Sequence, residues 1–104
     1  MKTEEKKKYL QNYRLVAAAA KRTEKQIFLY GKSEEILREQ KEYIFTLAKI
    51  KEEISLVDEP ILREILTQKY LCGFTLSKIS DNLGYSLRQI ARLHKKALEQ
   101  FIIL

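Results

Sequence analysis

Residues that interrupt or cross-link a chain are scarce in this sequence. Its 104 residues include one cysteine, one proline, three glycines and no tryptophan. With so little glycine and proline, the chain is expected to form long helices joined by few loops. The single cysteine, Cys72, excludes an internal disulfide framework and is typical of a reducing cytoplasm. Because Cys72 lies on the apolar side of an expected helix, we predict a buried, unreactive thiol.

Long apolar segments are also missing. No stretch reaches the roughly 18 apolar residues that a membrane span requires. The first ten residues, MKTEEKKKYL, carry both signs of charge and lack the apolar core of a signal peptide. We therefore expect a cytoplasmic protein that has no membrane partner.

The residues that catalysis or metal binding requires are equally sparse. His94 is the one histidine, and a single histidine with one distant cysteine cannot form a zinc site. The sequence has no glycine-rich phosphate loop and no credible serine–histidine–aspartate set. It predicts a protein that is not an enzyme and that binds no cofactor and no metal. His94 is expected near DNA or on the flank of a basic helix, where protonation at low pH adds charge.

Positive charge, by contrast, is in excess. Twenty Lys and Arg residues stand against fourteen Asp and Glu residues, so the formal net charge is +6. This balance favours nucleic acid or another anionic partner. The length fits one domain, or a small domain with an extended arm.

Apolar residues at heptad spacing predict two long helices in the first half of the chain. The first helix spans residues 3–30 and the second spans residues 33–57. Gly31 is expected as a left-handed cap between them, and Ser33 as the N-cap of the second. The first seam contains Tyr9, Tyr13, Val16, Ala20, Thr23, Ile27 and Tyr30, and the second contains Ile36, Gln40, Tyr43, Leu47, Ile50, Ile54 and Val57. The lysine-rich start, Lys6 to Lys8, is interpreted as a frayed, solvated helix end, with a phosphate-contacting arm as the alternative.

Two seams of similar length joined by three residues predict an antiparallel hairpin. Leu37, Ile44 and Phe45 widen the apolar surface outside the seams, and exposed apolar patches often mark interfaces. We therefore predict a homodimer or a higher homo-oligomer that assembles through residues 9–57. The sequence does not separate a hairpin within one chain from helices that pair between chains, with Gly31 straightened into one long rod.

A second break precedes a supporting helix. Asp58 or Glu59 is expected to cap it, and Pro60 fits its first turn because a missing N–H costs nothing there. The helix is expected to run from Pro60 to Cys72 and to end at Gly73. At the far end of the chain, the apolar tail 101–104 is interpreted as a continuation of the last helix that docks on earlier helices. The alternative for this tail is a contact surface for RNA polymerase.

The residues between these segments are typical of a helix-turn-helix. Thr75 can cap a helix that Gly84 ends, because glycine adopts a left-handed conformation without a steric clash. Ser86 and Gln89 then form a capping box that begins the next helix. The buried side of this last helix is assigned to Leu87, Ile90, Ala91, Leu93, Ala97 and Leu98.

The segment from Ser86 to Leu98 carries four cations and no acid. The major groove of DNA admits an α-helix, in which Arg and Gln side chains read base edges while flanking groups hold phosphates. We therefore predict that Arg88, Gln89 and Arg92 read bases. The predicted phosphate-binding residues are Ser86, Lys95, Lys96 and Lys78. The alternative interpretation is a basic, solvated helix on an ordinary helical bundle.

Residues 65–101 resemble region 4 of the sigma-70 family, the part that recognises the promoter −35 element. The shared positions are Leu66, Tyr70, Gly73, Phe74, Thr75, Leu76, Ile79, Leu83, Gly84, Ser86, Ile90, Leu93, Ala97 and Leu98. The chain is also similar to small phage and prophage proteins, among them the ArpU-type late transcriptional regulators, in which a long helical part precedes a sigma-region-4-like C-terminus. The positions that carry this second likeness are Arg63, Ile65, Leu66, Lys69, Tyr70, Gly73, Phe74, Thr75, Leu93, His94, Ala97 and Leu98.

Pattern and resemblance together predict an all-α protein in two parts. Residues 1–57 form a coiled-coil-like hairpin of long helices that serves as an oligomerisation arm, and residues 58–104 form a three-helix, sigma-region-4-like helix-turn-helix domain. The resemblance implies a sequence-specific DNA-binding transcription regulator of phage or prophage type, with residues 86–98 in the major groove. Sigma region 4 often has charged side chains where Leu87 and Ala91 stand here, which affects which bases are read. Nothing in the chain resembles sigma region 2, so a complete sigma factor is not expected.

Two other functions fit the same features. A DNA-packaging or assembly protein, such as a terminase small subunit, also pairs a helix-turn-helix with an oligomerising helical part. A sigma-like module that binds RNA polymerase and hardly touches DNA is the other alternative.

Overall fold

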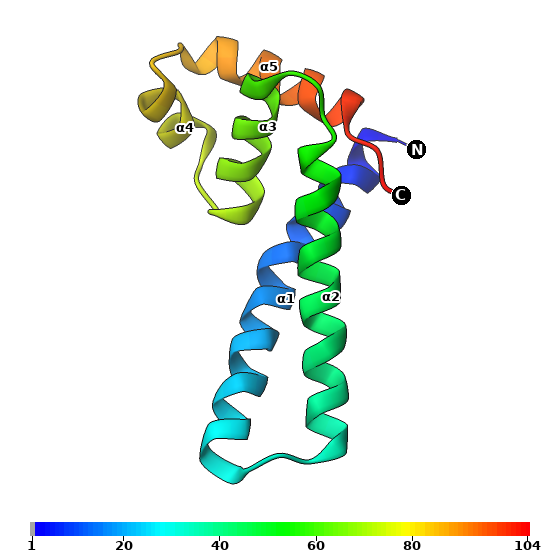
Figure 1. Ribbon diagram of the computed structural model, residues 1–104. Coiled ribbons are helices and arrows are strands. Elements are labelled where there is room, and N and C mark those ends of the chain that lie inside the picture. The colour runs from blue at the N-terminus through cyan, green and yellow to red at the C-terminus, as the bar shows by residue number, and fades with distance from the viewer. Residues whose placement is uncertain (1) are drawn as a thin grey trace.

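The structure, a computed structural model, describes residues 2–104, which form helices and no β-strand. The helices are α1 (Thr3–Tyr30), α2 (Glu34–Ser55), α3 (Pro60–Leu66), α4 (Leu76–Leu83) and α5 (Leu87–Gln100), and the π-helical turn η1 (Thr67–Leu71) continues α3. Figure 1 shows α1 and α2 as a long hairpin and the shorter helices gathered at its open end. The molecule measures 48 × 28 × 21 Å. The predicted all-α fold, a hairpin followed by a helix-turn-helix part, is confirmed.

The hairpin begins and ends close to where the heptad pattern places it. The Ser33 hydroxyl accepts the N–H of Ile36 at 3.2 Å, as predicted for the N-cap of α2. Gly31 has a φ of 86° and a ψ of 177°, so its φ is positive but the predicted left-handed helical cap is not formed. Tyr30, placed at the end of the first seam, is 81% exposed. The seam therefore stops before Tyr30.

At its open end the hairpin shares a core with the C-terminal helices. This cluster consists of Leu10, Tyr13, Ile50, Ile54, Val57, Leu62, Leu66, Tyr70, Ala97, Leu98 and Phe101. Its members come from α1, α2, α3, η1 and α5 and from the segments after α2 and α5. Close packing of this kind holds the elements in one orientation, because any rotation opens voids. The hairpin is therefore fixed relative to α5. The division of the chain into two domains between residues 57 and 58 stays a prediction.

A smaller core holds the helix-turn-helix itself. Ile65, Ile79 and Ile90 are fully buried and come from α3, α4 and α5. Ile61, Leu76, Leu83 and Leu93 pack around them. Each of the three short helices contributes one isoleucine, so none of them can bury its apolar side without the other two.

A buried carboxylate ties the end of the chain to the hairpin. Glu53 on α2 is 1% exposed and accepts hydrogen bonds from the Tyr9 hydroxyl, from Lys49 at 3.1 Å and from the backbone N–H of Leu104 at 2.7 Å. Burial of a charged group is tolerated when it is paired and hydrogen-bonded in this way. Burial also raises the pKa of Tyr9, and the hydrogen bond to Glu53 adds to this effect.

The tail docks as expected but does so without continuing the helix. α5 ends at Gln100, and Phe101 takes an extended conformation (φ −69°, ψ 132°) with a fully buried side chain. The predicted continuation of the helix to Leu104 is wrong. An extended segment brings Phe101 into the core and Leu104 to Glu53, which are the contacts that hold the tail in place.

The supporting helix also differs from its prediction at both ends. Glu59 is the N-cap of α3, yet its side chain makes no capping hydrogen bond. Beyond Leu66 the backbone widens into a π-helical turn, in which the N–H of Cys72 bonds to the carbonyl of Thr67 at 3.0 Å. The i→i+5 turn rotates later residues around the axis relative to an α-helix. Cys72 is consequently exposed, and the predicted buried thiol is wrong.

Candidate nucleic-acid interface

The corner between α4 and α5 has the capping geometry that the sequence predicts. The Thr75 hydroxyl accepts the N–H of Lys78 at 3.1 Å, and Gly84 ends α4 in the left-handed region (φ 73°, ψ 22°). Ser86 and Gln89 form a capping box, in which the N–H of Gln89 donates to Ser86 Oγ at 3.1 Å and the N–H of Ser86 donates to Gln89 Oε1 at 3.0 Å. Satisfied helix ends hold the corner in one conformation.

Side-chain hydrogen bonds fix the corner further. The Ser80 hydroxyl on α4 donates to the carbonyl of Tyr85 in the turn. The Asn82 amide donates to Gln68 Oε1 at 3.0 Å, which links α4 to η1. The direction of α5 relative to α4 is therefore set by backbone caps and by these side-chain contacts.

The predicted contact residues lie on the accessible side of the helix-turn-helix. Arg88, Gln89, Arg92, Lys95 and Lys96 on α5, together with Ser86 and Lys78, are all exposed. Among residues 2–104, neither Arg88 nor Arg92 takes part in an ion pair. Both guanidinium groups are therefore free to bind a polyanion. Their role as base readers stays a prediction.

Two residues assigned to the buried side of α5 belong to this outer surface instead. Leu87 is 52% exposed, and Ala91 is also exposed. The buried stripe of α5 consists of Ile90, His94, Ala97 and Leu98. At about 100° of rotation per residue, position 91 falls at the edge of this stripe. Position 87 falls in line with the stripe, but Leu87 is the first residue of α5 and is exposed there. The prediction for these two residues is wrong, and both lie beside the cations.

His94 faces the core and not the exposed side of α5. It is 8% exposed, and its Nε2 lies 2.7 Å from the Tyr70 hydroxyl. Burial lowers the pKa of His94 to about 4, and the positive charges of Lys7 and Lys69 act in the same direction. Burial likewise raises the pKa of Tyr70 to about 12. The expected place on the solvent-facing flank of the helix is therefore wrong, and the imidazole gains charge only below about pH 4.

Three of the predicted contact residues, Lys96, Gln89 and Ser86, have partners within the chain. Lys96 Nζ lies 3.1 Å from the Glu59 carboxylate at the start of α3. Lys96 and then Gln100 hold the pKa of Glu59 below its usual range through their hydrogen bonds. The Oε1 atom of Gln89 accepts from Ser86 in the capping box. A phosphate must compete with Glu59 for Lys96, and Gln89 has its amide N–H groups left for a base.

The beginning of α1 forms a contact with α5 that sequence reasoning missed. Lys6 Nζ donates to the carbonyls of Leu98 and Glu99 at 2.9 and 3.1 Å. A lysine at this place satisfies carbonyls that the last turn of a helix leaves without partners, and it complements the negative end of the helix dipole. The interpretation of Lys6 as part of a frayed end is wrong. Heptad spacing carries no signal for this contact, because it joins residues more than 90 positions apart.

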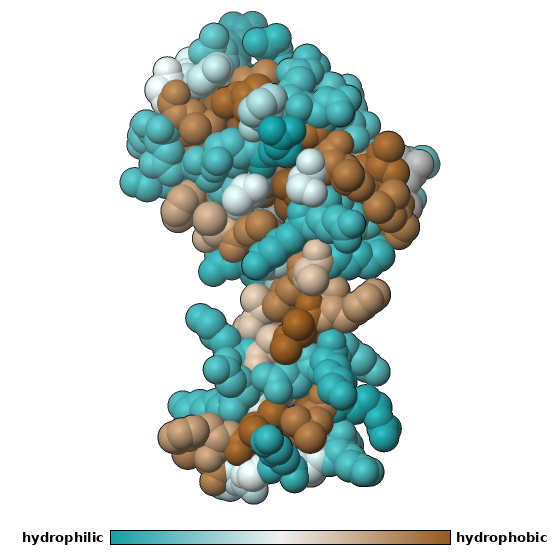
Figure 2. Space-filling model, viewed as in Figure 1, coloured by the Kyte–Doolittle hydropathy of each residue, from teal (hydrophilic) through white to brown (hydrophobic). Residues whose placement is uncertain are grey.

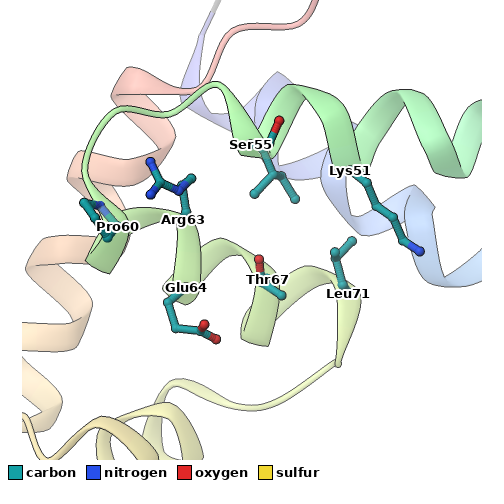
Figure 3. A pocket seen from close by; sticks show the side chains of 8 residues that line it. Lys51, Ser55, Pro60, Arg63, Glu64, Thr67 and Leu71 are labelled. Carbon is teal, nitrogen blue, oxygen red and sulfur yellow. The ribbon is translucent and has the colours of Figure 1, made fainter.

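A hollow on another side of the molecule offers no set of catalytic groups. It has a volume of about 370 Å³ and lies where α2 meets α3 and η1 (Figure 3). Arg63 within it donates to the carbonyls of Val57 and Asp58 at 2.6 and 2.8 Å, and Glu64 accepts from Gln68 at 3.1 Å. Arg63 thus ties α3 to the segment after α2, and Glu64 ties α3 to η1. Across residues 2–104, no group of three or more His, Cys, Asp or Glu side chains could hold a metal ion.

Within the same described range, no helix is both long enough and apolar enough to cross a membrane.

Comparison with known proteins finds a family that is similar to the segment containing the corner. Residues 59–100 match the family model of Sigma-70, region 4. Sigma-70 region 4 is a DNA-binding helix-turn-helix domain and has no enzymatic role. The match begins at the N-cap of α3 and ends with the last residue of α5. The hairpin of α1 and α2 lies outside it.

A curated relative supports the same assignment. The RNA polymerase sigma factor SigO of Bacillus subtilis (strain 168) is 46% identical to the chain over 37 residues. The match covers 36% of this chain and 21% of the relative, so the likeness concerns about a fifth of that protein. No solved structure matches the chain significantly.

Proposed function

We propose that this protein is a sequence-specific DNA-binding transcription regulator whose helix α5 enters the major groove. One observation carries the proposal. The segment similar to sigma region 4 presents a capped helix with two unpaired arginines, Arg88 and Arg92, on its exposed side. The major groove is wide enough for such a helix, and arginine is the side chain that most often reads guanine.

The roles within the interface follow from position on the helix. In a helix-turn-helix, the N-terminal residues of the second helix contact base edges. Arg88, Gln89 and Arg92 occupy the first six positions of α5 and are assigned to bases. Ser86, Lys95, Lys96 and Lys78 flank them and are assigned to phosphates. Residues 58–104 would then form the DNA-binding domain and residues 1–57 the oligomerisation arm.

The proposal extends to a phage or prophage type of regulator. It is supported by the combination of a long helical N-terminal part with a sigma-region-4-like C-terminal part. The ArpU-type regulators that the chain resembles have the same arrangement. Since the similarity to SigO covers 36% of this chain, the function of the hairpin is not taken from that relative.

Exposed apolar residues on the hairpin support a homodimer. Phe28, Leu15, Ile44 and Phe45 are 86%, 73%, 53% and 70% exposed. In Figure 2 apolar surface lies along the hairpin and at its tip. α1 contains seven basic and three acidic side chains, and α2 contains four basic and six acidic ones. A second copy that sets its α2 against α1 would pair opposite charges as well as cover apolar side chains.

Arginine substitutions test the proposed function. The probe is a labelled duplex carrying a site selected by the wild-type protein from a random library. Arg88→Ala and Arg92→Ala are each expected to weaken binding by about 1–3 kcal/mol, or about 5- to 150-fold, and to relax specificity. Arg38→Ala, a change of the same type on the hairpin, is the control and should bind as the wild type does. Wild-type affinity in both α5 variants would refute the placement of α5.

A sigma-like module that binds RNA polymerase is the second candidate. The observation in its favour is the likeness to a protein described as an RNA polymerase sigma factor. Retention of purified RNA polymerase by the immobilised protein, with no retention of DNA, would support this candidate over the first.

A further inference from the structure

A groove with cations on both sides lies beside the proposed recognition helix. It has a volume of about 410 Å³ and is formed by the beginning of α1, the beginning of α4 and the middle of α5. The residues that line it are Thr3, Glu4 and Lys7 from α1, Leu76 from α4, and Ala91, His94, Lys95 and Leu98 from α5. The family match does not include α1, so this groove joins the sigma-like segment to a part of the chain outside it.

Hydrogen bonds from Lys6 hold the α1 wall of the groove against α5. Lys6 binds the last carbonyls of α5, which sets the first two turns of α1 against that helix. Leu10, one turn further along α1, is fully buried in the shared core. Lys7 lies between these two anchors and is therefore held on the groove side of α1. Its amino group is close enough to His94 to lower the pKa of that buried imidazole further.

The charged groups of the groove favour an anion, although one lining carboxylate opposes it. Lys7 and Lys95 bring two ammonium groups, and Leu76 places the N-terminal turn of α4, the positive end of its dipole, in the same wall. Glu4 is the only acidic lining residue, and its carboxylate lies 3.4 Å from Lys7 Nζ. Glu4 and the Lys7 side chain are 77% and 36% exposed, so this pair is weak and can be exchanged for another anion.

We propose that this groove binds a backbone phosphate of the duplex that α5 reads, with Lys7 and Lys95 as its ligands. Ala91 and Lys95 lie on both the groove wall and the exposed side of α5, so the groove is continuous with the proposed interface. A duplex in contact with Arg88 and Arg92 would run its phosphates along this edge of α5. The first turns of the hairpin thus become a second DNA-contacting element. This inference rests on the proposed function.

The test compares three substitutions in α1 by fluorescence anisotropy with the selected duplex and a scrambled one. Lys7→Ala is expected to weaken binding about 5- to 10-fold on both duplexes, because a phosphate contact carries no sequence information. Its plot of log K against log salt should be shallower by about 0.9. Glu4→Gln is expected to tighten binding to both duplexes, since it removes the competing carboxylate. Lys8→Ala is the matched control; Lys8 is exposed and lies outside the groove, so its effect should stay under about 2-fold.

The outcomes separate this inference from the proposed function. If Lys7→Ala and Lys8→Ala behave alike while Arg88→Ala loses affinity, the regulator stands and the phosphate groove is wrong. If the wild-type protein retains no duplex, the proposed function fails and the groove proposal fails with it. Thermal unfolding of each variant checks that α1 stays docked, and Glu4→Gln leaves every contact of Lys6 in place.

Discussion

The side chain of His94 shows how one residue sets the pH range of the fold. In the folded protein its pKa is about 4, below the ordinary value of 6.5, because the imidazole is buried against Tyr70. Between pH 6.5 and pH 4 the unfolded chain therefore binds a proton at this residue that the folded chain does not bind. The free energy of unfolding should fall as the pH falls through this window.

A substitution at His94 isolates this effect. His94→Gln keeps a hydrogen-bonding group near Tyr70 but cannot take up a proton. Thermal melts at pH 7 and pH 4.5 should show a larger loss of Tm in the wild type than in His94→Gln. Equal losses in the two proteins would mean that His94 is protonated to the same extent in the folded and unfolded states.

Glu53 is the second residue whose role is decided by burial. Its carboxylate accepts from Tyr9, Lys49 and the Leu104 N–H, and Lys49 also donates to the Tyr9 hydroxyl oxygen at 3.1 Å. Glu53→Ala leaves these donors without their partner and is expected to lower the free energy of unfolding by about 2 kcal/mol. Chemical denaturation measures the change. Glu52→Ala, at the exposed neighbouring position, should alter stability by less than about 0.5 kcal/mol.

At the scale of single helices, cap chemistry determines where α4 and α5 begin and end. Thr75, Gly84, Ser86 and Gln89 act on their nearest neighbours, and such contacts are visible in the sequence. Ser86→Ala should lower the free energy of unfolding by about 1 kcal/mol, because an N-terminal N–H of α5 loses its acceptor. Ser86→Asp retains an acceptor and should recover most of the loss in the same denaturation experiment.

The pairing of α3 with α5 leads to a prediction about affinity. Glu59 and Lys96 are both partly exposed, at 42% and 49% of their side chains, and form an ion pair. Glu59→Gln would free Lys96 for a phosphate and is expected to tighten DNA binding by about 2-fold, with little change in stability. An unchanged affinity in the anisotropy assay would indicate that Lys96 lies outside the phosphate contacts.

The fold class, the extent of α1 and the caps of α4 and of the start of α5 could be predicted from the sequence, whereas contacts between distant segments could not. The 28 residues of α1 coincide with the predicted helix 3–30, because heptads and alanine-rich segments act locally. The docking of Lys6 on α5, the burial of Glu53 and the extended tail depend on which helices meet, and one-dimensional periodicity does not encode that. The exposure of Cys72 after the π-helical turn η1 could not be predicted either. The spacing of apolar residues does not show that one turn of a helix contains an extra residue.

In the candidate site, too, the features set by local spacing could be predicted, and those set by distant segments could not. Exposure of Arg88 and Arg92 follows from their position opposite the apolar stripe of α5. His94 was misplaced because a histidine is equally compatible with either side of an amphipathic helix, and Tyr70, its partner, is 24 positions away. Lys7 was not singled out because its neighbours in the groove come from α4 and α5.

At the scale of the whole molecule, the shared core makes the hairpin a rigid extension of the segment that is similar to sigma region 4. A dimer built on α1 and α2 would therefore hold two α5 helices at a fixed distance and would impose a fixed spacing on two half-sites. Light scattering of the purified protein should give the mass of two chains, and Phe45→Ser should shift it toward one. Leu56→Ser, at an exposed position near the other end of α2, serves as the control. A mass of many chains would favour a ring-forming assembly protein.

The salt dependence of duplex binding tests the central claim most directly, because it counts the phosphates that the cations neutralise. With the three cations Lys78, Lys95 and Lys96 on phosphates, log K plotted against log salt should have a slope of about −2.7 per subunit, and about 0.9 steeper if Lys7 also binds. The Arg88→Ala/Arg92→Ala double variant should retain a strong salt dependence while losing its preference for the selected site. A slope near zero in the wild-type protein would contradict a DNA-binding role for α5.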